Sequence, residues 1–502
     1  MQERFSRLVT LSHDIQEVSE MALVDRGPFR RAALKPYISQ MSQPNPTGLF
    51  DSNVAKILEQ QGFCWEEDPR SVYDPSQLYS ALERYATDWS QHEFVDEHLA
   101  HGIRMAFKTF AKPKGVSGLN ILTDKDVATK ALHGEKSAGL PSLGKKKDNL
   151  VYAFDREQQI RLGVKAPNPC IAYKRTQQGN KTRLVWGYPL EMTIMEARFA
   201  RPLIERFLAM RTPMAFGMTK LELGAKLHRY VEQGKGTQVC LDYSKFDSTI
   251  PRTLIKEAFR VLATWFSDEE LAEYGWDIIV KYFITTPIVM PDGHLYTGKN
   301  HGVPSGSYFT QMIDSIVNVM MMYALQSRFG FHFDPKSLYV LGDDVIVCVS
   351  GSFSIKSWAS YASKFGMVIH DDKKTEIGRT HFLGAYWDKG KPDVPIEQIV
   401  QKSIFPEKFR DYQGKPDRGA ENVLRSYAAS YLSAIKVVPR DRESCFSNFQ
   451  GMRSVDFPRR DEGELNDYMS GSQKFQSEEL KLLKFKPSSL DGPSTLSMRI
   501  ML

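Results

Sequence analysis

From about residue 238 onward, short apolar runs alternate with segments whose apolar residues recur at helical spacing. The run TQVCLDY predicts a short strand that ends on Asp242, and a helix follows with Pro251 near its first turn. The buried face of this helix would consist of Leu254, Ile255, Ala258, Phe259 and Leu262. This pattern places the Asp242 carboxylate at the end of a buried strand.

Two further segments predict β-hairpins. YFITTPIVMPDGHLYTGK has an Asp-Gly turn between β-rich arms. SLYVLGDDVIVCVS has apolar runs at 338–341 and 345–349 around the break Gly342-Asp343-Asp344. Gly and Asp are common turn residues, so a polar turn is one interpretation of this break. A metal site is the other interpretation, and it requires a third carboxylate from elsewhere in the chain.

A long helix is predicted after GVPSG, where Gly302, Ser305 and Gly306 suggest a flexible turn. The apolar stripe of the helix consists of Phe309, Met312, Ile313, Ile316, Val317, Met320 and Met321. A second face carries three polar residues spaced four apart, Thr310, Asp314 and Asn318. This face could be solvated. We favour a surface that binds a ribose, because the helix follows a Ser-Gly loop and lies between the two carboxylate segments.

Length and composition restrict the class of protein. A chain of 502 residues is too long for one compact core and should divide into two to four parts. Its five cysteines are scattered without a Cys-x-x-Cys pair, which argues against a disulfide framework or structural zinc site and fits a reducing compartment. No apolar run reaches 18 residues, and the N-terminus lacks the apolar core of a signal peptide, so we expect no membrane span.

Positive charge is concentrated in one part of the chain. The net charge is only +6, but residues 101–190 contain 17 Lys and Arg against six Asp and Glu. Such a stretch suits a surface that follows phosphates, although a solvated basic face would have the same composition.

Asp242 supplies the third carboxylate that the hairpin requires. If its strand neighbours the hairpin, Asp242 and Asp343 could together hold two divalent cations and stabilise an in-line phosphoryl displacement. Oxygen ligands favour Mg²⁺, with Mn²⁺ as an alternative. Taken singly, Asp242 could be a turn residue and Asp247 an N-cap, but neither role explains all three segments together.

These segments, in this order, resemble the RNA-directed RNA polymerases of the viral right-hand type. Within that group they are most similar to the enzymes of double-stranded RNA viruses of the partitivirus and picobirnavirus kind. LDYSKFDSTIP resembles motif A, GVPSGSYFTQMIDS resembles motif B and LGDDVIV resembles motif C. A lone Gly-Asp-Asp is weak evidence, whereas three motifs in order at workable spacing are strong evidence.

The resemblance implies a role for each matching residue of these motifs. Asp242 and Asp343 would be the principal metal ligands, assisted by Asp344 and by the backbone carbonyl of Tyr243. Asp247 would contact the ribose of the incoming nucleotide and favour one with a 2′-hydroxyl. The nucleotide site would be shaped by Ser305, Gly306 and Thr310.

Position 314 departs from the family pattern. Many family members place Asn four residues after the motif B Thr, and this chain has Asp314 there. A carboxylate only accepts hydrogen bonds. Asp314 would therefore pair with a basic neighbour, or Asn318 would share its task.

Segments outside motifs A, B and C extend the resemblance to about residues 136–387. AYKRTQQGNKTRLVWGYP resembles motif F, in which Lys174, Arg175, Lys181 and Arg183 would neutralise the triphosphate, although a charged hairpin has the same pattern. KSAGLP resembles motif G, which guides the template backbone, and includes Lys136, Ser137 and Gly139. This match is weaker, because small-residue loops are common.

Two segments after the hairpin complete the set of motifs. SKFGMVIHDDKKTE resembles motif D, in which Lys374, or less readily Lys373, would protonate the leaving pyrophosphate. FLGAYW resembles motif E, which supports the end of the primer or product through Phe382 and Leu383. A buried pair of strands is an equally good interpretation of FLGAYW.

The implied fold is an α+β right-hand polymerase with fingers, palm and thumb, and an antiparallel palm sheet packed on helices. We expect an N-terminal extension (1–70) that bridges fingers and thumb. The fingers would comprise residues 71–235 and an insertion at 263–300, and the palm would comprise 236–262 (motif A) and 301–390 (motifs B to E). A helical thumb with a C-terminal tail would follow (391–502).

The predicted function is synthesis of viral RNA, for genome replication and transcription, by two-metal nucleotidyl transfer. Its partners would be a single-stranded RNA template, the RNA product, ribonucleoside triphosphates and a viral capsid protein, inside a virion or in the host cytoplasm. A reverse transcriptase would usually carry a bulky aromatic residue where Asp247 stands. A two-metal nuclease would not need motifs B and F, and a silent RNA-binding scaffold would not need all of Asp242, Asp343 and Asp344.

Overall fold

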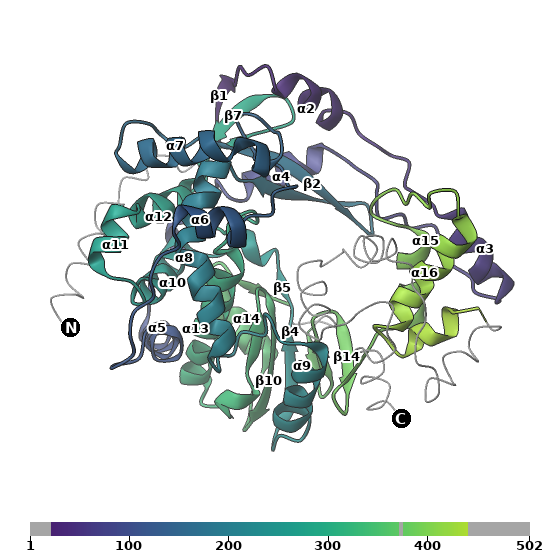
Figure 1. Cartoon of the computed structure of the whole chain (residues 1–502). Helices are drawn as coiled ribbons and strands as arrows, with labels where there is room; N and C mark the ends of the chain where they lie inside the picture. The colour runs from purple at the N-terminus through teal and green to yellow at the C-terminus, as the bar shows by residue number, and fades with distance from the viewer. Residues whose placement is uncertain (1–21, 371–374, 440–502) are drawn as a thin grey trace.

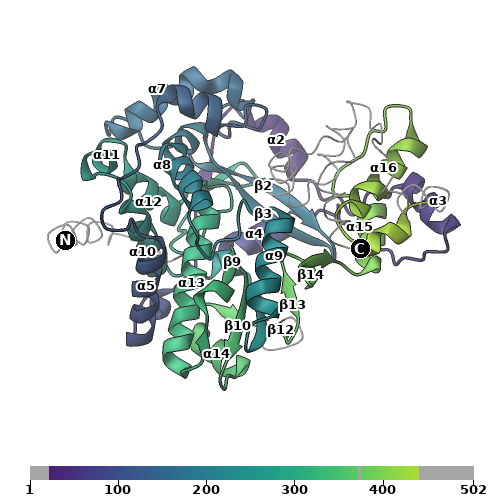
Figure 2. The ribbon, with the colours of Figure 1, turned by 60° about the horizontal axis from the view of Figure 1, so that its bottom comes forward.

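The computed structural model describes residues 22–370 and 375–439 of the chain. Its elements are arranged in an open ring (Figure 1). Most residues predicted as fingers form one side of the ring, and those predicted as palm form its base. Two helices of the predicted fingers range, α5 (Glu97–Phe110) and α9 (Lys220–Leu227), lie at this base beside the palm, and the residues predicted as thumb lie opposite the fingers. Figure 2 shows β2 and β3 extending from the fingers towards the thumb. Helices and mostly antiparallel sheets mix along the chain, as the α+β class requires.

An antiparallel sheet lies at the base of the ring in the strand order β12-β4-β10-β8, and β9 also pairs with β10. Its strands are β4 (Thr237–Leu241), β8 (His332–Phe333), β9 (Tyr339–Leu341), β10 (Asp344–Ser350) and β12 (Glu376–Ile377). β4 is the predicted strand that ends just before Asp242, and β9–β10 is the hairpin predicted around Gly342. Residues 345–349 are all buried, so both faces of β10 are covered.

Helices cover this sheet: α5 (Glu97–Phe110), α10 (Arg252–Ala263), α13 (Thr310–Phe329) and α14 (Ile355–Ser363). The predicted apolar stripes of α10 and α13 are buried throughout. Gly102 allows α5 to lie directly against α13, since a Cβ there would be 2.0 Å from the carbonyl oxygen of Met320. Next to the sheet, β5 (Tyr243–Ser244) pairs with β11 (Val368–Ile369).

A second five-stranded sheet forms the core of the fingers in the order β1-β7-β6-β2-β3. The strands are β1 (Val24–Pro28), β2 (Cys170–Gln177), β3 (Lys181–Gly187), β6 (Ile288–Val289) and β7 (His294–Thr297). β6 and β7 form the hairpin predicted at Asp292-Gly293, but its first arm is shorter than predicted. The YFIT segment belongs instead to α12 (Trp276–Thr285), because Ile279, Val280 and Phe283 are buried at helical spacing.

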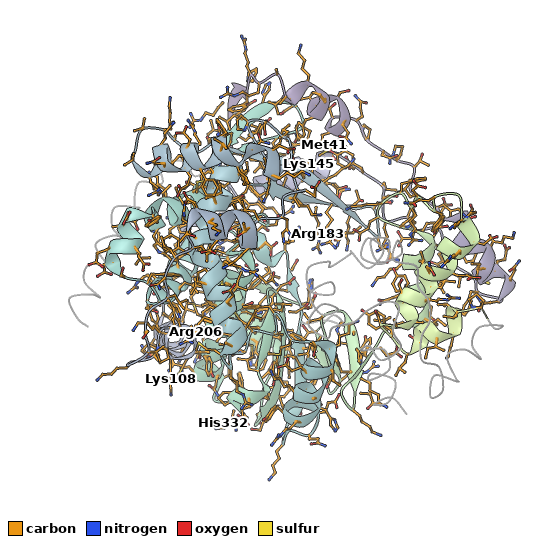
Figure 3. All side chains as sticks on the ribbon, in the orientation of Figure 1. Met41, Lys108, Lys145, Arg183, Arg206 and His332 are labelled. Carbon is orange, nitrogen blue, oxygen red and sulfur yellow. The ribbon has the colours of Figure 1, made fainter. Side chains whose placement is uncertain are left out.

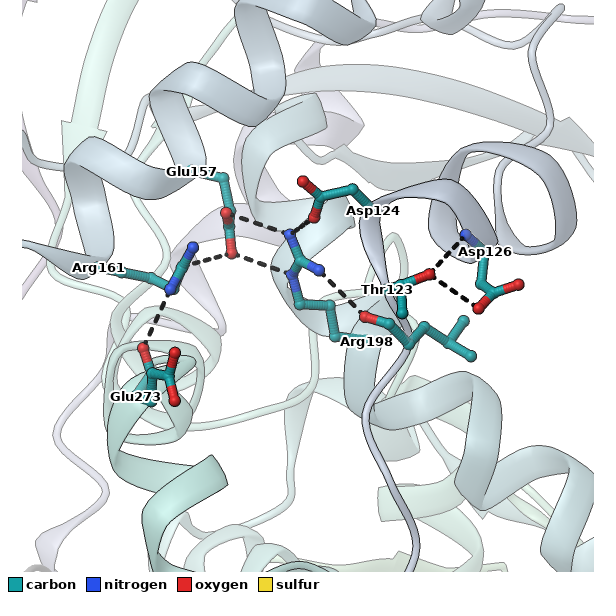
Figure 4. Close-up of polar contacts among 8 residues, drawn as sticks. Thr123, Asp124, Asp126, Glu157, Arg161, Arg198 and Glu273 are labelled. Atoms are coloured by element: carbon teal, nitrogen blue, oxygen red, sulfur yellow. Dashed lines mark hydrogen bonds and ion pairs between the residues drawn. The ribbon is translucent and has the colours of Figure 1, made fainter.

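The remaining fingers helices are α2 (Leu34–Met41), α4 (Ser76–Glu83), α6 (Asp124–Asp126), α7 (Leu150–Arg161), α8 (Leu190–Ala209) and α11 (Asp268–Glu273). Figure 4 shows the ion-pair network that joins three of them. Arg198 of α8 is buried and lies 3.2 Å (Nε to Oε1) from Glu157 of α7 and 2.6 Å (Nη2 to Oδ1) from Asp124 of α6. Arg161 also pairs with Glu157, at 2.8 Å. Charged side chains therefore hold these fingers helices together.

The segment before α4 crosses the ring twice. β1 pairs with β7 in the fingers, whereas α3 (Ser52–Gln60) packs against α15 (Ile396–Ile404) and α16 (Pro416–Ala428) on the thumb side (Figures 1 and 2). Asp51, which caps α3, forms a buried ion pair with Arg410, with 2.7 Å between Oδ2 and Nη1. Arg70 donates hydrogen bonds to the carbonyls of Lys402 and Phe405. The described part of this segment therefore contacts both the fingers and the thumb side of the ring.

A small antiparallel sheet connects palm and thumb, formed by β13 (Thr380–Phe382), β14 (Ala385–Asp388) and β15 (Lys391–Asp393), with α9 (Lys220–Leu227) beside it. Among the described residues, no helix combines the length and apolar character that a bilayer crossing requires.

Candidate active site

Strand register brings three predicted carboxylates to one end of the palm sheet. In the antiparallel β4–β10 pair, Leu241 lies opposite Val345, so Asp242 follows β4 at the end where Asp344 begins β10. Asp343 lies at the tip of the β9–β10 hairpin, after Gly342 with a φ of 65°. Asp242 and Asp343 are exposed and Asp344 is partly buried. The expected group of Asp242, Asp343 and Asp344 is therefore assembled from two distant segments.

Burial, and to a smaller extent mutual repulsion, raise the pKa values of two of these carboxylates. Crowding by surrounding protein, followed by repulsion from Asp343 and Asp242, raises the pKa of Asp344 to about 7. The pKa of Asp343 is raised by the same crowding and by Asp242, although Arg183 opposes the shift. His370 approaches Asp242, with 3.6 Å between Nε2 and Oδ2. A site with several carboxylates and little basic compensation is suited to a bound cation.

The donor set fits a hard divalent cation. Carboxylate oxygens are the ligands that Mg²⁺ prefers, and Mg²⁺ takes only one or two of them along with water and phosphate oxygens. Within residues 22–370 and 375–439, no three His, Cys, Asp or Glu side chains are grouped closely enough to hold a metal ion by themselves. An open set at a strand end is what a cation shared with a phosphate substrate requires. Asp242, Asp343 and Asp344 would hold it.

Asn318 supports the turn that carries Asp343. Its side-chain amide donates to the carbonyls of Gly342, at 3.1 Å, and Asp343, at 3.3 Å. Its oxygen accepts a hydrogen bond from the hydroxyl of Tyr243, at 3.3 Å. Asn318 is fully buried, so it does not lie on a solvated face. Its amide is occupied within the palm, which leaves little capacity to share in ribose binding.

Asp314 is buried beside other acids. Its Oδ1 has no hydrogen-bond partner, and no basic side chain of the described residues pairs with it. Burial, followed by repulsion from Asp247 and Asp343, raises the pKa of Asp314 well above its usual range. The expected pairing with a basic neighbour is therefore not made among the described residues, and burial favours the protonated form of Asp314. A protonated carboxyl can donate a hydrogen bond, as the amide of Asn does.

Asp247 lies between the carboxylate group and the motif B loop. It belongs to a short turn at Phe246–Ser248 and does not cap α10, whose first N–H groups are instead bonded by the side chain of Glu93. Burial and repulsion from Asp343 raise the pKa of Asp247 to about 6. Its carbonyl accepts a hydrogen bond from Val303 N–H at 2.6 Å, which links motif A to motif B.

The motif B loop is held more firmly than the expected flexible turn. Ser305 Oγ accepts a hydrogen bond from Trp186 N–H at 3.3 Å. Gly306 lies so close to β3 that a Cβ there would be 1.7 Å from the carbonyl oxygen of Trp186. Thr310 Oγ1 donates to the carbonyl of Pro304 at 2.7 Å. Ser305 and Gly306 nevertheless remain exposed, so the loop is both fixed and accessible.

The fingers hairpin β2–β3 presents three of the four predicted cations on one face. Arg175 and Arg183 are cross-strand partners, and Lys181 lies two residues from Arg183, so all three share a face. Arg183 lies between the fingers sheet and the palm (Figure 3), and it acts electrostatically on Asp247 and Asp343. Lys174 lies on the opposite face, with Nζ 3.6 Å from the centre of the Tyr73 ring. The structure therefore separates Lys174 from the other three.

Comparison with known proteins agrees with this geometry. Residues 64–406 match the family described as viral RNA-dependent RNA polymerase. The chain belongs to this family.

Individual relatives in this polymerase family come from double-stranded RNA viruses. The RNA-directed RNA polymerase of Cryptosporidium parvum virus 1 is 31% identical over 338 residues, 64% of this chain and 62% of that protein. The RNA-directed RNA polymerase of Atkinsonella hypoxylon virus is 23% identical over 286 residues, 45% of this chain and 43% of that protein. The chain thus matches less than two thirds of the length of these relatives.

A solved polymerase structure is similar in fold. The crystal structure of the RNA-dependent RNA polymerase of a human picobirnavirus aligns with a TM-score of 0.66 at 17% identity, covering 94% of this chain and 98% of that chain. The right-hand fold inferred from the sequence is confirmed.

The structure describes the segments predicted as motifs G and E. In motif G, Lys136 is exposed, Ser137 Oγ lies 2.9 Å from the hydroxyl of Tyr173, and Gly139 has a φ of 66°. In motif E, Phe382 is buried, so it supports the small sheet, and only Leu383 is partly accessible. Lys373 and Lys374 of motif D lie outside the described residues.

The sequence interpretation missed two buried ionisable residues beside the motif B loop. Glu196 of α8 accepts hydrogen bonds from Ser307 and Tyr308. Lys299 donates to the carbonyls of Phe283, Ile284 and Gly302, and burial holds its pKa well below the usual range. The available signal was a charged residue within an otherwise apolar pattern, as in the segment TIMEARF of this polymerase.

Proposed function

We propose that the chain is a template-directed RNA polymerase that joins the 3′-hydroxyl of a growing RNA to the α-phosphate of an incoming ribonucleoside triphosphate and releases pyrophosphate. The observation that carries this proposal is the β4–β10 register, which brings Asp242 to the Asp343-Asp344 turn opposite the Arg183 face of the fingers. Family membership supports the same conclusion. Genome replication and transcription of a viral RNA would be its tasks.

Catalysis would consist mainly of positioning and electrostatic stabilisation. Two divalent cations, held by Asp242, Asp343 and Asp344 with the Tyr243 carbonyl, would lower the pKa of the 3′-hydroxyl and neutralise charge on the phosphates. Arg175, Lys181 and Arg183 share the face of the hairpin from which they would contact the triphosphate.

Residues around the loop would select and orient the nucleotide. Asp247 would accept a hydrogen bond from the ribose 2′-hydroxyl, and the exposed Ser305–Gly306 backbone would lie along the nucleotide. Lys374 would donate a proton to the pyrophosphate. The template would pass motif G, and the end of the product would rest near Leu383.

The partners and location belong to the same proposal. A single-stranded RNA template, its product and ribonucleotides follow from the reaction. A capsid partner, and a place inside the particle or in the host cytoplasm, rest on the kinship with polymerases of double-stranded RNA viruses.

The test is incorporation of labelled ribonucleotides on a single-stranded RNA template with Mg²⁺. We expect template-length product from the wild type and none from Asp343→Asn, with RNA binding by gel shift unchanged. The matched control is Asp388→Asn, which changes an exposed carboxylate on β14. Normal synthesis by Asp343→Asn would remove the metal assignment. Incorporation of deoxyribonucleotides in preference to ribonucleotides would favour the reverse transcriptase alternative.

A further inference from the structure

A buried acid without a basic partner lies in the middle of α8. Glu196 has no exposed surface. Its Oε2 accepts two hydrogen bonds, from Ser307 Oγ at 2.9 Å and from Tyr308 N–H at 2.8 Å. Its Oε1 is buried without a hydrogen-bond partner. No ion pair joins Glu196 to a Lys or Arg of the described residues, unlike Glu157, which is equally buried.

Both groups bonded to Glu196 belong to the motif B loop. Ser307 and Tyr308 lie between Gly306 and Thr310, the residues that shape the proposed nucleotide site. The first half of the loop is fixed elsewhere, by Trp186 of β3 and by the Asp247 carbonyl. Glu196 therefore fixes the second half of the loop to the fingers, together with the Tyr308 hydroxyl, which donates to the carbonyl of Ala131.

The surroundings of Glu196 favour its neutral form. The titratable and charged groups that face it are Cys170 of β2, Tyr188, Tyr308 and, more remotely, Lys146. Burial raises the pKa of Glu196 to about 8, although the hydrogen bonds from Tyr308 and Ser307, and then Lys146, oppose the shift. A neutral carboxyl can accept both hydrogen bonds through its carbonyl oxygen, without the cost of an unpaired buried charge.

We propose that Glu196 is a positioning residue of the nucleotide site, which through its two hydrogen bonds fixes Ser307 and Tyr308 and thereby sets the geometry of Ser305, Gly306 and Thr310. The inference rests on the proposed function, because it assigns the loop to nucleotide binding. Glu196 itself touches no substrate. Its effect reaches the nucleotide through the backbone of the loop.

Two substitutions at Glu196 distinguish the loss of its ionisation from the loss of its hydrogen bonds. Glu196→Gln keeps an acceptor oxygen and a donor and cannot ionise, whereas Glu196→Leu removes both hydrogen bonds. At pH 7 we expect Glu196→Leu to raise the KM for ribonucleotides about tenfold or more, with RNA binding unchanged. Glu196→Gln should stay close to the wild type. The matched control is Glu205→Gln, an exposed glutamate on the same helix.

The pH profile provides a readout that a merely structural role would not change. As pH rises through about 8, wild-type Glu196 loses its proton, and kcat/KM for nucleotides should fall. Glu196→Gln lacks this ionisation, so the ratio of its kcat/KM to that of the wild type should rise about tenfold between pH 7 and pH 9.5. Titrations common to both proteins cancel in the ratio. A flat ratio would overturn the proposal, even if Glu196→Leu failed to fold.

A measurement without turnover distinguishes this inference from the proposed function. Hydrogen exchange of residues 302–310 should be faster in wild type at pH 9 than at pH 7, after correction for the intrinsic pH dependence. Glu196→Gln should show no such increase. Faster exchange at pH 9 in an inactive wild type would contradict the polymerase function and support the role of Glu196. Unchanged exchange in an active wild type would support the polymerase function and contradict the role of Glu196.

Discussion

The edge of the palm sheet and the interior around α8 and α13 both concentrate carboxylates, but they place them in opposite environments. Asp242 and Asp343 face solvent at strand ends, where like charges lie close together. Glu196 and Asp314 are buried without a basic partner, and burial raises the pKa of each. The proposed function requires negative charge on the first group. Burial favours the neutral form of the second.

This difference can be measured with isosteric amides. Asn and Gln keep the shape and part of the hydrogen bonding of Asp and Glu, but they remove the negative charge. An amide should therefore abolish the role of a carboxylate at the sheet edge and preserve the role of one in the interior. The ion-paired Glu157 forms a third case, in which a buried charge is retained by two arginines (Figure 4).

Asp242→Asn should produce the largest effect. It removes negative charge where we expect cations to bind, and we expect nucleotide incorporation to fall by about 10³-fold, about 4 kcal/mol of transition-state stabilisation. Single-turnover incorporation on a primed template measures this directly. The thermal midpoint should stay within a few degrees of wild type. A variant that loses less than tenfold would contradict the assignment of Asp242 as a metal ligand.

Arg198→Met tests the paired buried carboxylate. Removing one partner of a buried ion pair leaves charge without compensation, and we expect a loss of about 3–5 kcal/mol in the free energy of unfolding. Denaturant unfolding measures the loss, with Arg201→Met, at a partly exposed position of the same helix, as control. Equal stability of the two variants would mean that Glu157 does not need Arg198 to remain charged in the interior.

Asp247→Tyr tests the carboxylate between the two groups. A bulky ring next to Val303 should obstruct the ribose 2′-hydroxyl, so we expect the preference for ribonucleotides over deoxyribonucleotides to fall about 10²-fold. Competition between the two nucleotide types at one template position gives the ratio. A preference equal to that of the wild type would exclude Asp247 from ribose selection.

Asp314→Asn should have the smallest effect. Because burial favours the neutral form of Asp314, the amide replaces it with a neutral group of similar shape. We expect incorporation within about threefold of wild type and no loss of stability. A defect as large as that of Asp242→Asn would show that Asp314 acts as an anion, and the distinction between edge and interior would then fail at this position.

Local patterns predicted the palm well. Period-two and helical spacing located β4, β10 and α13, and the order of the motifs paired Asp242 with Asp343 before any strand register was known. The face of a hairpin on which a side chain lies is also a local property, because adjacent residues of a strand point to opposite faces. The sequence analysis nevertheless grouped Lys174 with Arg175. Counting charges without assigning faces caused that error.

Contacts between distant segments could not be predicted in the same way. Glu196 and Ser307 are 111 residues apart in sequence, and nothing near either residue indicates the other. The absence of a cation beside Asp314 likewise depends on which segments pack around α13. Burial favours the neutral form of an acidic residue, which is normally charged. Local composition is a poor guide to whether a single charged side chain is buried.

The two crossings of the ring by the N-terminal segment have a consequence for biosynthesis. The apolar face of α3, with Val54, Ala55 and Leu58, is covered by α15 and α16, and Asp51 bonds to a residue 359 positions later. At translation rates of about 5–20 residues per second, that partner follows roughly 20–70 s after Asp51. The thumb can therefore close only late in synthesis. A ribosome that stops before about residue 400 would release a chain with a complete palm and an uncovered α3, which quality-control factors could recognise.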